Sequence, residues 1–161
     1  MILPSVVRLA APADEPELAV LIRSAAEEGM MFKVSEQKVL GICKRIINAR
    51  KNPNAVPQIL GVIGTSTDLQ AMTALVASQP DYSDEWFLGE AWTFVRPDCR
   101  RSHHAQELLA FSKRAAAMLG LKCISGIASN VRTEPKVRLY RRRFGTAIGA
   151  FFMFDPNGQA A

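Results

Sequence analysis

Cysteine is scarce in this chain of 161 residues, which contains only Cys43, Cys99 and Cys123. The number is odd and no two cysteines have the short spacing of a metal-binding pair, so the sequence argues against a disulfide framework and against structural zinc. Free thiols are typical of a reducing compartment. We therefore expect a cytoplasmic protein.

Long apolar runs are also absent. No segment approaches the roughly 18 apolar residues that a membrane-spanning helix needs, and the first residues lack the charged start and apolar core of a secretory signal. No internal repeat, low-complexity tract or dividing linker is present. Because 48% of the residues are hydrophobic, we expect a single soluble domain over residues 1–161 with a sizeable core and no membrane partner.

Charge is unevenly distributed along the chain. Residues 1–95 carry a net charge of −3 and residues 96–143 carry +9, within a total of +5. A basic half beside an acidic half suits a polyanionic ligand on one side and a cationic substrate on the other. Surface charge that merely clusters is the alternative, and nucleic acid could use the same basic residues.

Hydrophobic periodicity predicts alternating strands and helices. Strands are expected over residues 6–10, 59–65, 71–78, 86–95, 122–128 and 146–154, and helices over 15–29, 35–50 and 134–143, with one more after residue 102. Trp86 and Trp92 share the parity of one strand, which favours a place in the core.

Residues 91–109 are the most informative segment. An apolar strand ending near residue 96 is followed by a basic turn and then by an amphipathic helix. Ser102 is a suitable N-cap for that helix, and the first N–H groups of a helix have no partners within it. Together with Arg100 and Arg101, these donors suit a phosphate group.

This segment resembles the cofactor motif of the GNAT superfamily of acyl-CoA-dependent N-acetyltransferases. Members have a strand ending in Val-x-Pro, then Arg/Gln-x-x-Gly-x-Gly/Ala, then a helix that begins with paired leucines. The matching residues are Val95, Pro97, Arg100, Ala105, Leu108 and Leu109. His103 stands where the family usually has glycine, so its side chain must point away from a bound pyrophosphate or lie beside it.

The resemblance implies that acetyl-CoA is the acyl donor. The main chain of Phe94 and Val95 would pair with the pantetheine arm of CoA. The turn that would hold the pyrophosphate comprises Arg100, Arg101, Ser102, His103, His104 and Ala105. His103 and His104 are adjacent and have no evident third ligand, so we expect no metal.

A second resemblance lies in residues 137–145, which are similar to the Leu-Tyr-x-x-x-Gly-Phe segment of the same family, with the last pair inverted to Phe144-Gly145. In the family this tyrosine commonly protonates the departing thiolate, so the resemblance assigns Tyr140 as the general acid. A phenol with a pKa of about 10 suits that task. An aromatic packed under the sheet is the alternative. Family members often carry asparagine seven residues earlier, where this chain has Thr133, with Asn130 nearby.

The general base is less clearly marked. Family members often place a glutamate six residues before the valine, whereas this chain has Gly89 there and Glu90 one residue later. Because side chains alternate along a strand, Glu90 faces the wrong side unless a bulge re-aims it, and Gly89 would permit one. Asp84 and Glu85 are competitors, and a solvated surface carboxylate is the other alternative for Glu90.

The element order resembles the GNAT fold over nearly the whole chain, which implies an α/β (α+β) protein of three α/β/α layers around a mixed, mostly antiparallel sheet splayed at the CoA site. The implied activity is N-acetyltransfer from acetyl-CoA to an amine acceptor. A non-catalytic GNAT-like module that binds nucleic acid or protein through its basic face is the alternative. Residues 30–32 would line the acceptor pocket or form a hydrophobic bridge between two helices. Asp81 and its acidic neighbours favour a cationic acceptor. A second subunit would cover an exposed edge of the sheet in a homodimer.

Overall fold

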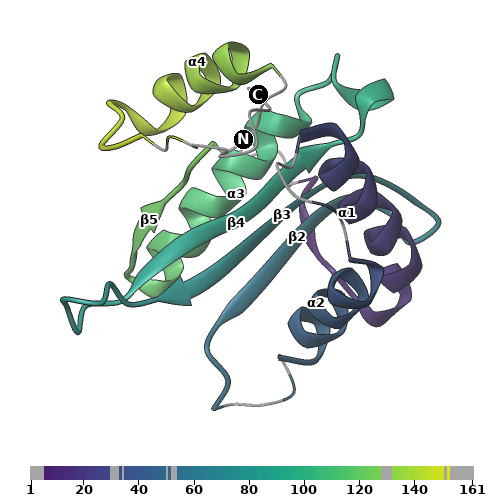
Figure 1. Cartoon of the computed structure of the whole chain (residues 1–161), viewed down its shortest axis with the longest axis horizontal. Coiled ribbons are helices and arrows are strands. Elements are labelled where there is room, and N and C mark those ends of the chain that lie inside the picture. The colour runs from purple at the N-terminus through teal and green to yellow at the C-terminus, as the bar shows by residue number, and fades with distance from the viewer. Residues whose placement is uncertain are drawn as a thin grey trace.

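The computed structural model describes residues 6–29, 33, 35–49, 51, 54–127, 132–150 and 152. Within these residues it contains a five-stranded sheet and four α-helices (Figure 1). The elements are β1 (Arg8–Leu9), α1 (Glu15–Gly29), α2 (Glu36–Ala49), β2 (Gln58–Thr65), β3 (Asp68–Ser78), β4 (Phe87–Val95), α3 (His104–Leu119), β5 (Lys122–Ile124) and α4 (Thr133–Phe144). Short 3₁₀ turns, η1 (Pro12–Asp14) and η2 (Pro97–Cys99), precede α1 and α3.

The sheet is mixed and mostly antiparallel, as the sequence predicted. Its strands follow one another in chain order, and β4 and β5 form its parallel pair. A parallel pair needs a crossover, which α3 provides. Side chains of α1 and α2 pack on one face of the sheet and those of α3 on the other, so the described residues form three layers.

Most predicted elements are confirmed, but three strands differ. The first strand spans two residues, Arg8–Leu9, and β5 spans three, Lys122–Ile124, although five and seven residues were predicted. Residues 146–150 belong to no strand, and most of the remaining predicted strand, up to 154, lies outside the described residues. The expectation that a second subunit covers a sheet edge stays a prediction.

Trp86 was wrongly predicted to lie in the core. It precedes β4 and is 43% exposed, whereas Trp92 packs against the core cluster between the sheet and α1 and α2. Strand parity therefore held only for the tryptophan that lies inside the strand.

An ion pair between Arg8 and Asp14 joins β1 to the turn that precedes α1. Asp14 is fully buried and receives two hydrogen bonds from the Arg8 guanidinium, at 2.7 and 2.8 Å. Its carboxylate also accepts the N–H of Ala11 at 2.7 Å. Hydrogen bonding from Arg8, above all, lowers the pKa of Asp14 to about 2. The carboxylate thus joins β1 to the turn that leads into α1.

We expect Asp14→Ala to lower the free energy of unfolding by about 3 kcal/mol at pH 7, because it leaves the Arg8 guanidinium and a main-chain N–H without their partner. Since the folded pKa of Asp14 lies below the unfolded value, this stabilisation is present above pH 4 and is lost as the pH falls toward 2. Urea unfolding of both proteins at pH 7 and near pH 2 tests this. Asp81→Asn, in an exposed loop, is the control. If the difference in unfolding free energy between the wild type and Asp14→Ala is as large near pH 2 as at pH 7, the stabilising role of the Asp14 carboxylate is contradicted.

Candidate active site

The strands β4 and β5 separate partway along their length. Their parallel pairing ends at Gly89 and Ile124. Beyond that point β4 continues to Val95, whereas residues 125–127 lie outside any strand. We call the opening between residues 90–95 and 125–127 the wedge; Figure 1 shows β5 diverging from β4 on the side where α4 lies.

The main-chain groups of Thr93 and Val95 face the wedge. The Arg96 N–H donates to the carbonyl oxygen of Gln70 at 2.9 Å, which marks these two as a hydrogen-bonded pair of the β3–β4 ladder. Hydrogen-bonded and non-bonded pairs alternate in an antiparallel ladder. By this register Phe94 bonds with β3, and Thr93 and Val95 turn their N–H and C=O groups away from it. From the resemblance we expected the main chain of Phe94 and Val95 to pair with the pantetheine arm. The register with β3 instead leaves the main-chain groups of Thr93 and Val95 open toward the wedge.

Glu90 reaches the wedge because β4 contains a bulge. Glu90 lies opposite Leu75 and Trp92 lies opposite Ala74, so Ala91 is an extra residue without a partner in β3. In a regular strand Glu90 would share the face of Trp92, which packs toward α1 and α2. The bulge turns Glu90 to the opposite face. The bulge that Glu90 needs in order to face this side is present, and it lies immediately after Glu90.

Tyr140 meets Glu90 at the narrow end of the wedge. The Tyr140 hydroxyl, on α4, donates a hydrogen bond to Glu90 Oε1 at 2.6 Å. Burial raises the pKa of Glu90, and hydrogen bonds from Tyr140, Ser125 and Thr93 partly offset that rise. Burial, and after it the Glu90 carboxylate, raise the pKa of Tyr140 far above its ordinary value. The phenol is therefore protonated at neutral pH.

The second carboxylate oxygen of Glu90 is buried without a hydrogen-bond partner among the described residues. Buried polar atoms in proteins are almost always bonded, so an unpartnered one marks a place for a donor from a ligand or water. The two proposed catalytic side chains, 50 positions apart in the chain, therefore share one hydrogen bond and keep one acceptor unused.

The turn between β4 and α3 presents main-chain donors. The N-cap of α3 is His103, one residue later than predicted, and the Ser102 hydroxyl accepts the His104 N–H at 3.2 Å. Within the described residues, the N–H groups of Arg101, His103 and Ala105 have no acceptor. At the positive end of a helix, such groups are suited to an anion.

The His103 backbone does not require glycine. Its φ is −87°, in a region that any residue adopts, and its side chain is exposed. Histidine in place of the usual glycine therefore causes no backbone strain here.

The Arg100 guanidinium is held by three neighbours. Its Nε donates to the carbonyl oxygen of Val95 at 3.2 Å, its carbon lies 5.7 Å from the centre of the Phe94 ring, and its Nη2 pairs with Glu28 of α1. Lys136 of α4 lies close to the same pair: burial lowers its pKa, Glu28 opposes that effect and Arg100 adds to it. A phosphate at Arg100 would have to share the guanidinium with Glu28.

The remaining residues of the turn divide into two groups. The Arg101 side chain is exposed at the turn. His104 instead faces β3, where its Nε2 lies 2.8 Å from Gln70 Oε1, and burial lowers the pKa of its imidazole. The His104 N–H also has a partner, the Ser102 hydroxyl, so His104 contributes neither its imidazole nor its N–H to the group of open donors.

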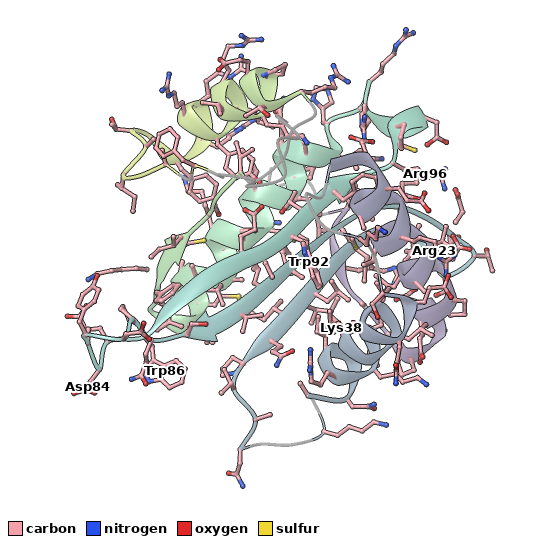
Figure 2. All side chains as sticks on the ribbon, viewed as in Figure 1. Arg23, Lys38, Asp84, Trp86, Trp92 and Arg96 are labelled. Atoms are coloured by element: carbon pink, nitrogen blue, oxygen red, sulfur yellow. The ribbon has the colours of Figure 1, made fainter. Side chains whose placement is uncertain are left out.

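The acidic loop before β4 lies away from the wedge. Glu85 is exposed and pairs with Lys122 at 2.8 Å. This contact lies at the paired end of β4 and β5, where Phe87 is opposite Lys122. Asp84 is exposed in the same loop (Figure 2). Glu90, not Asp84 or Glu85, is therefore the carboxylate that the fold brings to Tyr140.

Several contributors to the site were not singled out from the sequence. They are Glu28, Thr73, Thr93, Ser125 and Lys136, and none belongs to a motif. Strand parity could have identified Thr93, two residues before Val95; the others depend on contacts between distant elements. Residues 30–32 and Asn130, which were considered as site residues from the sequence, lie outside the described residues.

Two other features are absent from the described residues. These residues contain no group of three or more His, Cys, Asp or Glu side chains placed to hold a metal ion. Of the helices placed by the structure, none is long and apolar enough to cross a membrane.

Similarity to known proteins comes from structure alone. No family model matches the chain, and no curated protein matches it. Among solved structures, it is similar to AAC(6')-Iy, solved in complex with the bisubstrate analogue CoA-S-monomethyl-acetylneamine: the TM-score is 0.70 at 10% identity, over 92% of this chain and 95% of the other.

Two further structures extend this similarity. A ribosomal-protein-alanine N-acetyltransferase from Brucella melitensis biovar Abortus 2308 has a TM-score of 0.66 at 14% identity, over 92% of this chain and 98% of the other. The integron cassette protein HFX_CASS3, from the mobile metagenome of Cole Harbour Salt Marsh, has a TM-score of 0.68 at 19% identity, over 92% and 88%. At sequence identities this low, the structural similarity establishes a shared fold.

Proposed function

The chain has the GNAT fold, and on that premise we propose that it is an N-acetyltransferase that moves an acetyl group from acetyl-CoA to an amine. The observation that carries the proposal is the meeting of Tyr140 and Glu90 at the narrow end of the wedge, 2.6 Å apart. Neither side chain is placed there by local sequence: the bulge after Glu90 and the packing of α4 are both required.

The residues of the wedge suit acetyl-CoA. The open N–H groups of Arg101, His103 and Ala105 would take the pyrophosphate, with Arg101 and Ser102 beside them. The main chain of Thr93 and Val95 would pair with the pantetheine amides. When bound, acetyl-CoA supplies a thioester carbonyl for the amine to attack and a thiolate as the leaving group.

Glu90 and Tyr140 would then move the protons. Glu90 takes the proton of the attacking amine at its unpartnered Oε2, and Tyr140 gives its phenolic proton to the sulfur. A phenolate beside a buried carboxylate would place two negative charges in contact, which is strongly unfavourable. Glu90 must therefore be protonated when Tyr140 releases its proton, and its proton afterwards restores the phenol.

We propose the cytoplasm as the compartment, on the state of the thiols. All three cysteines are free, and burial raises the pKa of Cys43 to about 11. A reducing compartment, the cytoplasm, suits such a chain.

Release of CoA thiol from acetyl-CoA tests the proposal. We expect release above background with at least one acceptor from a panel of an amino acid, a polyamine, an aminoglycoside and a peptide with a free N-terminus. The rate should rise with pH as the amine and Glu90 lose their protons. No release with any acceptor across pH 6–9 would contradict the proposed activity.

A further inference from the structure

Two threonines share a part-buried hydrogen bond on the face of the sheet that also carries Glu90. Thr73 of β3 is fully buried, and its Oγ1 lies 2.8 Å from Oγ1 of Thr93, directly opposite in β4. The buried Thr73 hydroxyl would be costly without a hydrogen-bond partner. Thr93 supplies that partner.

The direction of the hydrogen bond between them can be assigned. Within the described residues, Thr93 Oγ1 is the partner found for the Thr73 hydroxyl. Because a buried hydroxyl must donate its hydrogen, Thr73 donates to Thr93. The hydrogen of the Thr93 hydroxyl is then directed elsewhere. Thr93 and Glu90 are neighbours on the same face of β4, because they lie opposite Thr73 and Leu75, which are two residues apart in β3. Tyr140 bonds to Glu90, and hydrogen bonding from Thr93 lowers the pKa of both groups.

We propose that Thr93, oriented by Thr73, is a positioning residue for the Glu90–Tyr140 pair. Its hydroxyl donates to whichever oxygen of the pair carries negative charge during the reaction, first the Glu90 carboxylate and then the Tyr140 oxygen. This matters because the carboxylate can only accept, so Tyr140 has no donor in Glu90 until that group is protonated. The inference rests on the proposed function, because it assigns Thr93 a part in the same proton transfers.

The groups that face the pair come from α4, β4, β5 and the segment after β5, where Ser125 lies. Tyr140 lies on α4, Thr93 on β4, and Cys123 on β5 is the titratable neighbour that interacts with both Glu90 and Tyr140. Burial raises the pKa of the Cys123 thiol, so it is neutral where Glu90 titrates. On the enzyme, the acid limb of the pH profile therefore reports Glu90. The amine acceptor also titrates, so all variants are compared with the same acceptor, whose contribution is the same in each.

Thr93→Val tests the proposal. We expect kcat to fall about tenfold, as for the loss of one hydrogen bond to a charged group, and the acid limb of the kcat/KM profile to move to higher pH. Thr93→Ser restores the hydroxyl and should restore both. Thr73→Val should act in the same direction more weakly, because it frees the Thr93 hydroxyl to rotate. Thr65→Val, at the exposed end of β2, is the control.

A structural role gives a different result. If Thr93 only packs, valine leaves kcat and the pH profile unchanged, and that outcome would overturn the proposal. Titration of the Glu90 carboxyl carbon by NMR gives a readout without turnover: its pKa should be higher in Thr93→Val than in the wild type. If the wild type shows no transfer to any acceptor, the proposed function fails, while this titration still decides whether Thr93 bonds to Glu90.

Discussion

Tyr140→Phe should lower kcat by about 100-fold and leave the Kd for acetyl-CoA within about threefold of the wild type. The substitution removes the proton donor, while the ring keeps its stacking against Phe144, whose centre lies 5.9 Å away. Steady-state kinetics give kcat, and isothermal titration gives the Kd. The phenol also lowers the pKa of Glu90. The acid limb of the kcat/KM profile of Tyr140→Phe should therefore lie at higher pH than that of the wild type.

Tyr82→Phe is the matched control, because the chain has two tyrosines and Tyr82 is 92% exposed. It should leave kcat unchanged. Unchanged turnover in Tyr140→Phe would remove Tyr140 from the mechanism. A large loss of acetyl-CoA affinity would instead indicate that the phenol acts in binding.

Ala105→Glu should weaken acetyl-CoA binding by about 30-fold or more while slightly stabilising the fold. Ala105 is the second residue of α3, where a carboxylate complements the helix dipole and adds about 0.5 kcal/mol to stability. The same negative charge would repel a pyrophosphate at the open N–H groups, and about 2 kcal/mol of lost attraction corresponds to 30-fold in Kd. Because affinity should fall while stability rises, the result distinguishes a binding defect from misfolding.

Isothermal titration with acetyl-CoA and thermal unfolding without ligand measure the two effects. The control is Ala117→Glu, which adds the same charge at an exposed position near the other end of α3. Its acetyl-CoA affinity should equal that of the wild type. Wild-type affinity in Ala105→Glu would mean that the pyrophosphate does not lie at this turn.

Local patterns predicted the framework of the site well. The strand, basic turn and helix around residues 91–109 are where the sequence placed them, because β-forming residues, proline and helical periodicity agree there. The bulge in β4 entered the sequence analysis only as the condition under which Glu90 would face the site, and Gly89 as a residue that would permit it; the extra residue is Ala91. Its position after Glu90 is what brings that side chain to Tyr140.

The rest depends on contacts between distant parts of the chain. The ion pair of Arg100 with Glu28 joins α1 to the turn after β4, and no local pattern encodes that pairing. Which β4 groups face the wedge follows from the register with β3, so the sequence could not separate Phe94 from Thr93. The apolar residues after 145 have strand-forming composition, yet residues 146–150 form none, because a strand also needs a neighbour to pair with.

Thermal unfolding with and without acetyl-CoA is the most direct test of the central claim, which is that the wedge and the α3 turn bind an acyl-CoA. A ligand at 100 times its Kd stabilises the folded state by about 2.7 kcal/mol, which raises the Tm by about 5–10 °C for a domain of this size. We predict a rise of this order at millimolar acetyl-CoA. No shift at saturating concentration would contradict the acyl-CoA site and favour a non-catalytic module with the same fold.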